Sequence, residues 1–274
     1  MLFRSTDTHW GVRNDNPSFL DNSKMFLDNL FFQYLEQHSI KTIIHLGDLV
    51  DRRKYINIYT ATRLRNDFLD KLIGYDVHFI AGNHDIFYKN TNEVNSLREL
   101  VHKKYDFKIY DKHCEQVTFD GLPILFIPWI CDENRKQIME QIKGAKNEIA
   151  MGHLELQGFE MYKGSMVSHG DDPTLFDHFD MVMSGHYHHR STNGHIWYLG
   201  SHAEFTWADY NDPKGFHIFD TETRELKFIQ NPYGMFNKTF YDDTDESFDI
   251  NNLDFSSLKD KIVKVVRSEE HTSE

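Results

Sequence analysis

The stretch MVMSGHYHHR runs from Met181 to Arg190 and joins an apolar block to a cluster of histidines. The apolar residues at its start indicate a buried strand, and His186, His188 and His189 follow directly after its end. Histidine is the commonest metal ligand, and its side chain titrates near neutral pH. Taken alone, the stretch is equally compatible with a metal site and with a polar turn that happens to contain histidine.

The rest of the chain repeats this arrangement. Short apolar blocks alternate with stretches of helical spacing such as Lys24–Gln37 and Ile58–Leu72, which predicts an α/β fold. A polar cluster follows each of five blocks: Asp7-Thr8-His9, Gly47-Asp48 to Arg53, Gly82 to Asp85, Gly152-His153 and Gly185 to His189. The carboxyl ends of parallel strands meet at the edge of a sheet where ligands bind. The clusters therefore predict one site assembled from five loops.

Further elements are predicted along the chain. Gln116–Trp129 reads as a hairpin that turns at Asp120-Gly121, and Glu133–Gly144 reads as a helix. Residues 195–201, 214–220 and 226–232 read as three consecutive antiparallel strands.

Bulk composition restricts the class of protein. The chain has 274 residues, enough for one large domain or one domain and part of another. A net charge of −13, from 43 acidic and 30 basic residues, argues against a protein that grips DNA by itself. We find no apolar run long enough to span a membrane, no secretory signal, and only Cys114 and Cys131 as cysteines. These features predict a cytoplasmic protein, in the host cytoplasm if a phage encodes it.

The polar clusters contain the side chains of a metal site. The candidate ligands are Asp7, His9, Asp48, Asn83, His153, His186 and His188. Asp7 and His9 stand two residues apart, as do the two histidines of G-H-x-H, so each pair projects to one side of an extended segment. Carboxylates and imidazoles with one amide suit Mn, Fe or Zn better than Mg or Ca. The set exceeds one tetrahedral zinc and predicts two ions that share a carboxylate and clamp an in-line displacement at phosphorus.

At this point a family is recognisable. The motifs D-x-H, G-D-x-x-D, G-N-H-D, G-H and G-H-x-H, in this order, resemble those of the calcineurin-like metallophosphoesterases. The resemblance covers about Asp7 to Asp220 and is specific as a set. It implies a four-layer α/β (α+β) sandwich, in which helices flank two mixed β-sheets, and two divalent metal ions, with Mn as the expected metal.

The resemblance also implies roles. Asp7, His9, Asp48 and His188 resemble the ligands of the first metal, and Asp48, Asn83, His153 and His186 those of the second, with Asp48 bridging. His84 resembles the catalytic histidine that contacts the scissile phosphate, and Asp85 the partner that orients it. Arg52 and Arg53 are candidates for binding substrate phosphate, with a surface salt bridge as an equal alternative. Asp51 is expected to support the ligands, whereas His45 and His189 are not expected to be ligands.

The motif contexts favour a nuclease. DTHWGVRND at 7–15, GDLVDRRKYIN at 47–57, GNHDIFYKN at 82–90 and GHLELQGFEM at 152–161 resemble the SbcD-type nuclease subunits of double-strand-break repair. TWAD at 206–209 resembles the recombination endonuclease subunits of tailed bacteriophages. This resemblance implies a metal-dependent exo- or endonuclease of DNA, partnered by a coiled-coil ATPase resembling SbcC and forming a homodimer in the intact protein.

Two alternatives remain. The same fold could act as a phosphatase on small-molecule or protein phosphoesters, for which a deep narrow pocket would speak. The protein could also be a non-catalytic scaffold of the same fold. However, every ligand position carries a metal-binding residue and the catalytic position carries His84, which argues against a scaffold.

Domain boundaries follow the composition. Residues 6–234 are expected to form the metallophosphoesterase domain. After Pro232 the chain becomes acidic and polar, and residues 235–267 are interpreted as the start of a truncated DNA-clamping domain. The segments 1–5 and 268–274 are interpreted as translated sequencing-adapter sequence, because LFRS and RSEEHTSE match the two adapter ends, and are left out of the expected fold.

Overall fold

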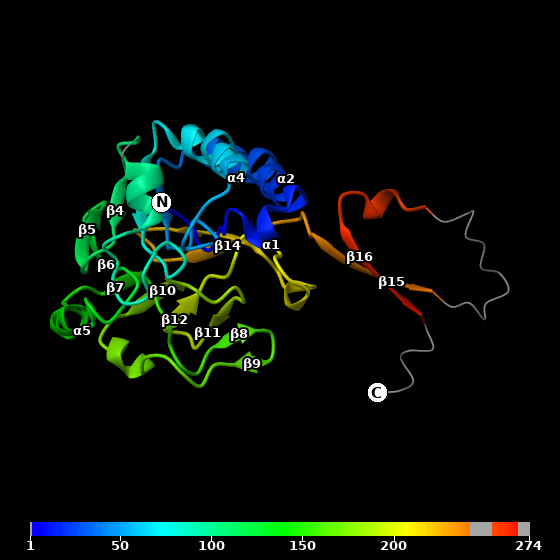
Figure 1. Cartoon of the computed structure of the whole chain (residues 1–274). Helices are drawn as coiled ribbons and strands as arrows, with labels where there is room; N and C mark the ends of the chain where they lie inside the picture. Colours follow the sequence, from blue (N-terminus) through cyan, green and yellow to red (C-terminus); the bar gives the residue numbers. More distant parts are fainter. Residues whose placement is uncertain (1, 103, 242–253, 268–274) are drawn as a thin grey trace.

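The computed structural model of the chain describes residues 2–102, 104–241 and 254–267. Its largest part contains two six-stranded sheets (Figure 1). The first sheet has, in spatial order, β14 (Leu226–Gln230), β13 (Gly215–Phe219), β1 (Leu2–Ser5), β2 (Thr42–His45), β3 (Asp76–Ile80) and β4 (Lys108–Tyr110). Strands β1 to β4 are parallel, and β13 and β14 extend the sheet in antiparallel pairing.

The second sheet is also mixed. Its order is β11 (Ser191–Thr192), β12 (Ile196–Tyr198), β10 (Met181–Gly185), β7 (Ile149–His153), β6 (Leu122–Ile127) and β5 (Glu115–Phe119). The four central strands are parallel, and the two edge strands are antiparallel to their neighbours. A small hairpin, β8 (Glu160–Tyr162) and β9 (Ser165–Met166), lies outside it.

One strand prediction is wrong. The stretch 195–201 does not pair with the two strands that follow it, because β12 lies parallel to β10 in the second sheet. Only β13 and β14 form the expected antiparallel pair, and they belong to the first sheet. The chain crosses from one sheet to the other between Tyr198 and Gly215, and that crossing carries the polar residues discussed below.

Helices cover the outer faces of both sheets. The first sheet is covered by α2 (Pro17–Phe26), η1 (Leu27–Phe31), α3 (Phe32–Gln37), α4 (Ile58–Arg63), η2 (Leu64–Phe68), η3 (Leu69–Leu72) and η4 (Leu97–His102). The second is covered by α5 (Arg135–Gly144) and η5 (Pro173–Phe176). The remaining helical turns are α1 (Val12–Asp15), η6 (Trp207–Asp209) and η8 (Ser256–Leu258).

The first long helix begins earlier than the spacing predicted, at Pro17 rather than Lys24. Asn16 caps it by accepting a hydrogen bond from the Ser18 amide, and proline at the first helical position is preset for a helix. The second predicted helix, Ile58–Leu72, is confirmed as the continuous run α4, η2 and η3.

Three apolar cores separate four layers. Successive residues of a strand face opposite sides, so Ile43 packs under the helices whereas Ile44 packs between the two sheets. Phe79 and Ile80 of β3 divide in the same way. A third core lies between the second sheet and α5, where Ile138 is buried. Figure 1 shows the resulting order of helices, sheet, sheet and helices, which confirms the expected sandwich.

The segment after the sandwich forms a separate unit. Strands β15 (Phe236–Tyr241) and β16 (Ile262–Arg267) pair in parallel with each other and lie beside the sandwich in Figure 1. Phe236 attaches the unit by packing against Trp207 and Phe19. The assignment of residues 235–267 to a DNA-clamping domain stays a prediction, and residues 242–253 of it lie outside the described residues.

Of the segments interpreted as adapter-derived, 268–274 lies outside the described residues, whereas Leu2–Ser5 forms β1. The backbone of β1 is therefore part of the first sheet, although residues 2–5 were left out of the expected fold. That these residues derive from an adapter stays a prediction. None of the described helices is both long and apolar enough to cross a membrane.

Candidate metal centre

The five polar clusters meet at one place. They follow the carboxyl ends of β1, β2 and β3 in the first sheet and of β7 and β10 in the second. The two sheets therefore contribute to one site, as the alternation of apolar and polar blocks predicted. All seven candidate ligands are brought together, and each of them contacts another.

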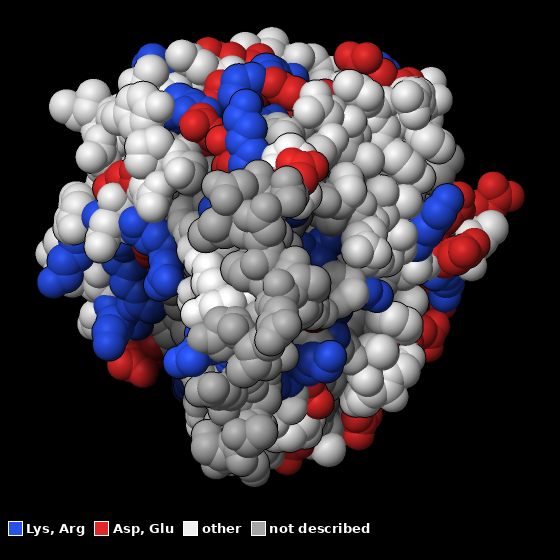
Figure 2. Space-filling view, turned by 90° about the vertical axis from the view of Figure 1, so that its right-hand side faces the viewer, with Lys and Arg blue, Asp and Glu red and all other residues white. Residues whose placement is uncertain are grey.

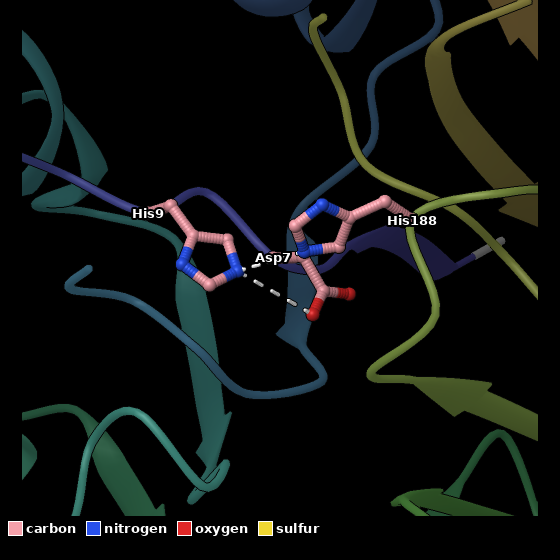
Figure 3. A group of neighbouring side chains, drawn as sticks. All are labelled: Asp7, His9 and His188. Atoms are coloured by element: carbon pink, nitrogen blue, oxygen red, sulfur yellow. Dashed lines mark hydrogen bonds and ion pairs between the residues drawn. The ribbon is translucent and has the colours of Figure 1, made fainter. Parts of the chain in front are cut away.

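The first group contains Asp7, His9 and His188. The His9 and His188 rings turn their Nε2 atoms toward each other at 3.0 Å, and His9 Nε2 lies 3.9 Å from Asp7 Oδ1 (Figure 3). Asp7 and His9 come from the loop after β1, and His188 comes from the loop after β10. One carboxylate oxygen and two ring nitrogens thus converge on a single point.

The second group contains Asp48, His153 and His186, with Asn83 between the rings. The Asn83 amide oxygen lies 3.0 Å from His153 Nε2 and 2.9 Å from His186 Nδ1. His153 is held by its other ring nitrogen, which lies 2.7 Å from the Leu46 carbonyl. This backbone contact leaves Nε2 of His153 directed at the site.

Asp48 faces both groups. Its Oδ2 atom lies 3.6 Å from His9 Nε2 and 3.3 Å from His153 Nε2. Burial alone would raise the pKa of this carboxyl, but the facing imidazoles of His153 and His9 hold the pKa well below its usual range. The carboxylate is therefore charged and is placed where a ligand shared by two ions would stand.

The donor set fits divalent cations. Burial and the neighbouring His9 hold the pKa of His188 well below its usual range, so the ring is neutral, which is the form that binds metals. Asp7 and Asp48 supply buried carboxyl oxygens. Buried carboxyl groups and converging imidazoles suit borderline divalent ions, and the two groups would hold two of them.

The backbone is strained at this site. Asp7, His9, Asp48 and His186 have φ of 51°, 43°, 56° and 90°, in the region that L-residues rarely adopt. Such conformations persist where surrounding contacts over-determine them, and they cluster at ligand-binding sites. Gly82 permits the close approach of the second motif, because a Cβ at this position would lie 2.3 Å from Asp48 Oδ1.

Comparison with known proteins agrees with this geometry. Residues 5–190 match the family described as calcineurin-like phosphoesterase. The chain belongs to that family. Exonuclease subunit 1 of Enterobacteria phage T4 is 39% identical over 231 residues, covering 82% of this chain and 66% of that protein. An SbcCD nuclease subunit of Staphylococcus epidermidis is 23% identical over 263 residues, covering 82% of this chain and 67% of that protein.

The chain thus spans just under two thirds, 66%, of the length of the T4 relative. A solved archaeal phosphodiesterase superposes with a TM-score of 0.42 and 12% identity, over 84% of this chain and 99% of that one. The family uses a dinuclear metal centre, which the two side-chain groups of this calcineurin-like phosphoesterase can accommodate.

The expected pairing of Asp85 with His84 is wrong. The Asp85 carboxylate is fully buried and accepts hydrogen bonds from the backbone amides of Asp48, Leu49 and Gly82, each at 2.9 Å. His84 instead places its Nδ1 2.5 Å from the backbone carbonyl of Asp51. Asp85 therefore organises the loops of the phosphoesterase site, and a backbone group orients the ring that lies edge-on to His9.

Arg52 forms a salt bridge, which was the alternative to substrate binding. Its guanidinium pairs with Asp15 and lies 4.6 Å from the centre of the Tyr55 ring, so it is engaged within the protein. Asp15 also accepts a hydrogen bond of 2.6 Å from the Thr60 hydroxyl. Arg53 lines a cavity of about 190 Å³, and its contact with substrate stays a prediction.

The other histidine expectations agree with the structure. His45 is fully buried against the Thr8 hydroxyl at 3.0 Å, and burial lowers its pKa to about 3. His189 points away from the ligand groups, to Asp212 at 2.9 Å. Asp51 supports His9, with its Oδ1 atom 3.5 Å from His9 Nδ1.

Two charged residues beside the centre were not predicted. Glu155 places Oε1 3.8 Å from His186 Nε2, and Lys214 donates a hydrogen bond to the His188 carbonyl at 2.7 Å. Lys214 precedes the apolar block of β13, and a lysine at the start of a fully buried strand is the signal that could have found it. Glu155 stands two residues after His153 and carries no comparable signal.

Proposed function

We propose that this chain is the catalytic part of a metal-dependent DNA nuclease, a phosphodiesterase with a dinuclear centre. The observation that carries the proposal is the position of Asp48, whose Oδ2 atom faces a ring of each ligand group at 3.6 Å and 3.3 Å. A carboxylate placed between two groups of metal-binding side chains suits a pair of ions that act on phosphorus. The names of the relatives, an exonuclease subunit and a nuclease subunit, favour DNA as the phosphodiester.

The side chains would divide the work. Asp7, His9, Asp48 and His188 would hold one ion, and Asp48, Asn83, His153 and His186 the other. Bound there, two divalent ions supply Lewis-acid stabilisation of the charge on the phosphoryl oxygens.

His84 would act on the substrate rather than on the ions. Its Nδ1 atom donates to the Asp51 carbonyl, which fixes the ring and leaves Nε2 as the atom that can meet substrate. Nε2 can donate to a phosphoryl oxygen or give a proton to the leaving alkoxide only from the protonated ring, so His84 would carry its second proton when the substrate binds. The imidazole is half-buried at the edge of the site, so a bound phosphodiester could reach it. The backbone carbonyl takes the orienting role that was expected of Asp85.

Manganese is the metal we propose. Imidazole nitrogen together with carboxylate and amide oxygen is a mixed donor set, and Mn is the ion expected from the resemblance of the motifs. The two cysteines, Cys114 and Cys131, are buried and unbridged, as expected in the reducing cytoplasm where we propose that the protein works.

Partners belong to the same proposal. The relatives are subunits by name, so we propose a coiled-coil ATPase resembling SbcC as the second subunit. A second copy of the chain would cover exposed apolar side chains, among them Tyr55, Ile58, Tyr59, Tyr88 and Val94. Tyr55 and Val94 line one cavity, which places them on the same face.

The acidic total charge does not speak against a DNA substrate. On the face shown in Figure 2, lysine and arginine side chains gather at the left and near the centre, although the whole chain carries −13. Local basic groups of this kind can contact phosphates while a partner subunit supplies the remaining grip.

The test is an activity assay on the purified chain. The protein is stripped with chelator, reloaded with Mn²⁺, and given single-stranded DNA, duplex DNA and p-nitrophenyl phosphate, with His84→Gln as the matched control. We expect Mn²⁺-dependent cleavage of DNA that the control loses.

Each other outcome selects a different function. Hydrolysis of p-nitrophenyl phosphate without DNA cleavage would identify the phosphatase alternative. Two bound metal equivalents with no hydrolysis of any substrate would identify a non-catalytic scaffold.

A further inference from the structure

Lys214 lies buried directly behind the candidate metal centre. Its side chain is 3% exposed and its ammonium has three acceptors. These are Asp209 Oδ1 at 2.8 Å, Asp212 Oδ2 at 2.7 Å and the backbone carbonyl of His188 at 2.7 Å. An ammonium without water has three protons to place, and all three have a partner here.

Hydrogen bonds at the backbone hold His188 and the residue that follows it. The His188 carbonyl receives a second hydrogen bond from the Ser201 amide at 3.2 Å. The next side chain along the loop, His189, is held by Asp212 Oδ1 at 2.9 Å. Both sides of the peptide that follows His188 are therefore fixed to the Lys214 cluster.

Asp209, another acceptor of Lys214, supports the ring of His188 through Phe205. Asp209 closes a turn by accepting hydrogen bonds from the backbone amides of Phe205 and Thr206 at 3.0 Å and 2.8 Å. The Phe205 ring, carried by that turn, lies edge-on to His188 and to His9, with ring centres 5.6 Å apart in each case. The cluster thus supports His188 both from its carbonyl and from its ring face.

We propose that Lys214 is a positioning residue that sets the imidazole of His188 for metal binding. The inference rests on the proposed dinuclear centre. A contact between Lys214 and substrate phosphate does not fit, because the ammonium is buried and its three donors are used. Stability alone is also a weak reason for the cluster, since a buried ion group contributes little more than a well-packed apolar replacement.

The proposal predicts an effect on one metal site of two. His188 belongs to the group with Asp7 and His9, so loosening it should weaken that site and spare the site of His153 and His186. Loss of a residue that orients a ligand typically lowers metal affinity about 10–100-fold.

The test variant removes one positive and one negative charge together. Lys214→Met with Asp212→Asn keeps the local charge constant and keeps a polar side chain beside His189. Lys227→Met is the control, because Lys227 is exposed on the neighbouring strand β14. Asp212→Asn alone is the second variant, and it decides the question if the double variant does not fold.

Metal binding is measured by calorimetry on chelator-stripped protein titrated with Mn²⁺, and by the Mn²⁺ EPR signal. We expect two equivalents for the parent and the Lys227→Met control. We expect one site weakened about 10–100-fold in the double variant, with a mononuclear signal replacing that of a coupled pair, and a smaller loss at the same site in Asp212→Asn.

Two unchanged affinities in a folded variant would overturn the inference and leave Lys214 as a folding residue. Equal weakening of both sites would overturn it as well, because His188 would then not be the group that Lys214 sets. A parent chain that binds no Mn²⁺ would instead refute the proposed function, so the two failures are distinguishable.

Discussion

Asp85 accepts a hydrogen bond of 2.9 Å from the backbone amide of Asp48, which binds the third motif to the turn that carries the carboxylate between the two ligand groups. Asp48 stands in a left-handed conformation with φ of 56°, which a free chain would rarely adopt. The buried Asp85 carboxylate helps to hold that conformation, and two residues 37 apart in sequence act as one unit.

Asp85→Asn is expected to destabilise the protein and to weaken metal binding. An amide nitrogen would replace one oxygen that faces backbone N–H groups, leaving buried donors without an acceptor. The free energy of unfolding should fall by about 3 kcal/mol. Urea denaturation of the metal-free protein measures it, with Ser96→Ala, which removes one of the donors to Asp85, as a milder control. A large loss of rate without loss of stability would instead restore a catalytic partnership with His84.

Asp48→Asn is expected to weaken both metal sites together. The substitution removes the charge that faces His9 and His153, so neither group keeps its shared carboxylate. We expect fewer than two metal equivalents by elemental analysis after dialysis, with affinity lowered at least about 10–100-fold. Retention of two full equivalents would show that Asp48 is not the shared ligand.

His84→Gln is expected to lower DNA cleavage by about 10²–10⁴-fold, the usual contribution of a positioned acid or base. The ring touches no candidate ligand except edge-on His9, so metal content and DNA affinity should stay close to those of the parent. Single-turnover cleavage, elemental analysis and DNA titration measure the three quantities. Metal loss in proportion to activity would make His84 a ligand or a structural residue.

Arg13→Gly is expected to stabilise the fold. Arg13 is exposed and has φ of 56° and ψ of 45°, a left-handed conformation that costs a side chain about 1–2 kcal/mol and glycine almost nothing. After the larger entropy loss of glycine on folding, a net gain of about 0.5–1 kcal/mol remains, which corresponds to a rise in Tm of about 1–4 °C.

Asn14→Gly is the control for this prediction, because asparagine tolerates a left-handed conformation far better than arginine. Differential scanning calorimetry should therefore show a smaller shift for it. A lower Tm for Arg13→Gly would mean that the arginine side chain makes a contact that stabilises the fold by more than the cost of its left-handed conformation.

Much of the candidate site could be predicted from the residues alone. Asp48, Asn83, His153, His186 and His188 follow apolar blocks that read as buried strands, and the carboxyl ends of parallel strands meet at one edge whatever the details of the loops. The spacing of Asp7 and His9 also pointed to one site, although both residues have positive φ and so do not lie in the extended segment that the spacing assumed. Order and spacing were therefore enough to place the seven candidate ligands together.

The partners of these residues could not be predicted in the same way. Arg52 meets Asp15, and Lys214 meets the carbonyl of His188, only because loops from different strands are folded against one another. For the same reason the Asp85 carboxylate meets backbone amides from another loop, and His84 meets the carbonyl of Asp51. Tertiary structure also decided which sheet holds β12, because a short apolar strand can pair equally well in either. Local pattern determined which side chains reach the edge of the sheets, and long-range packing of the loops decided which atoms they meet there.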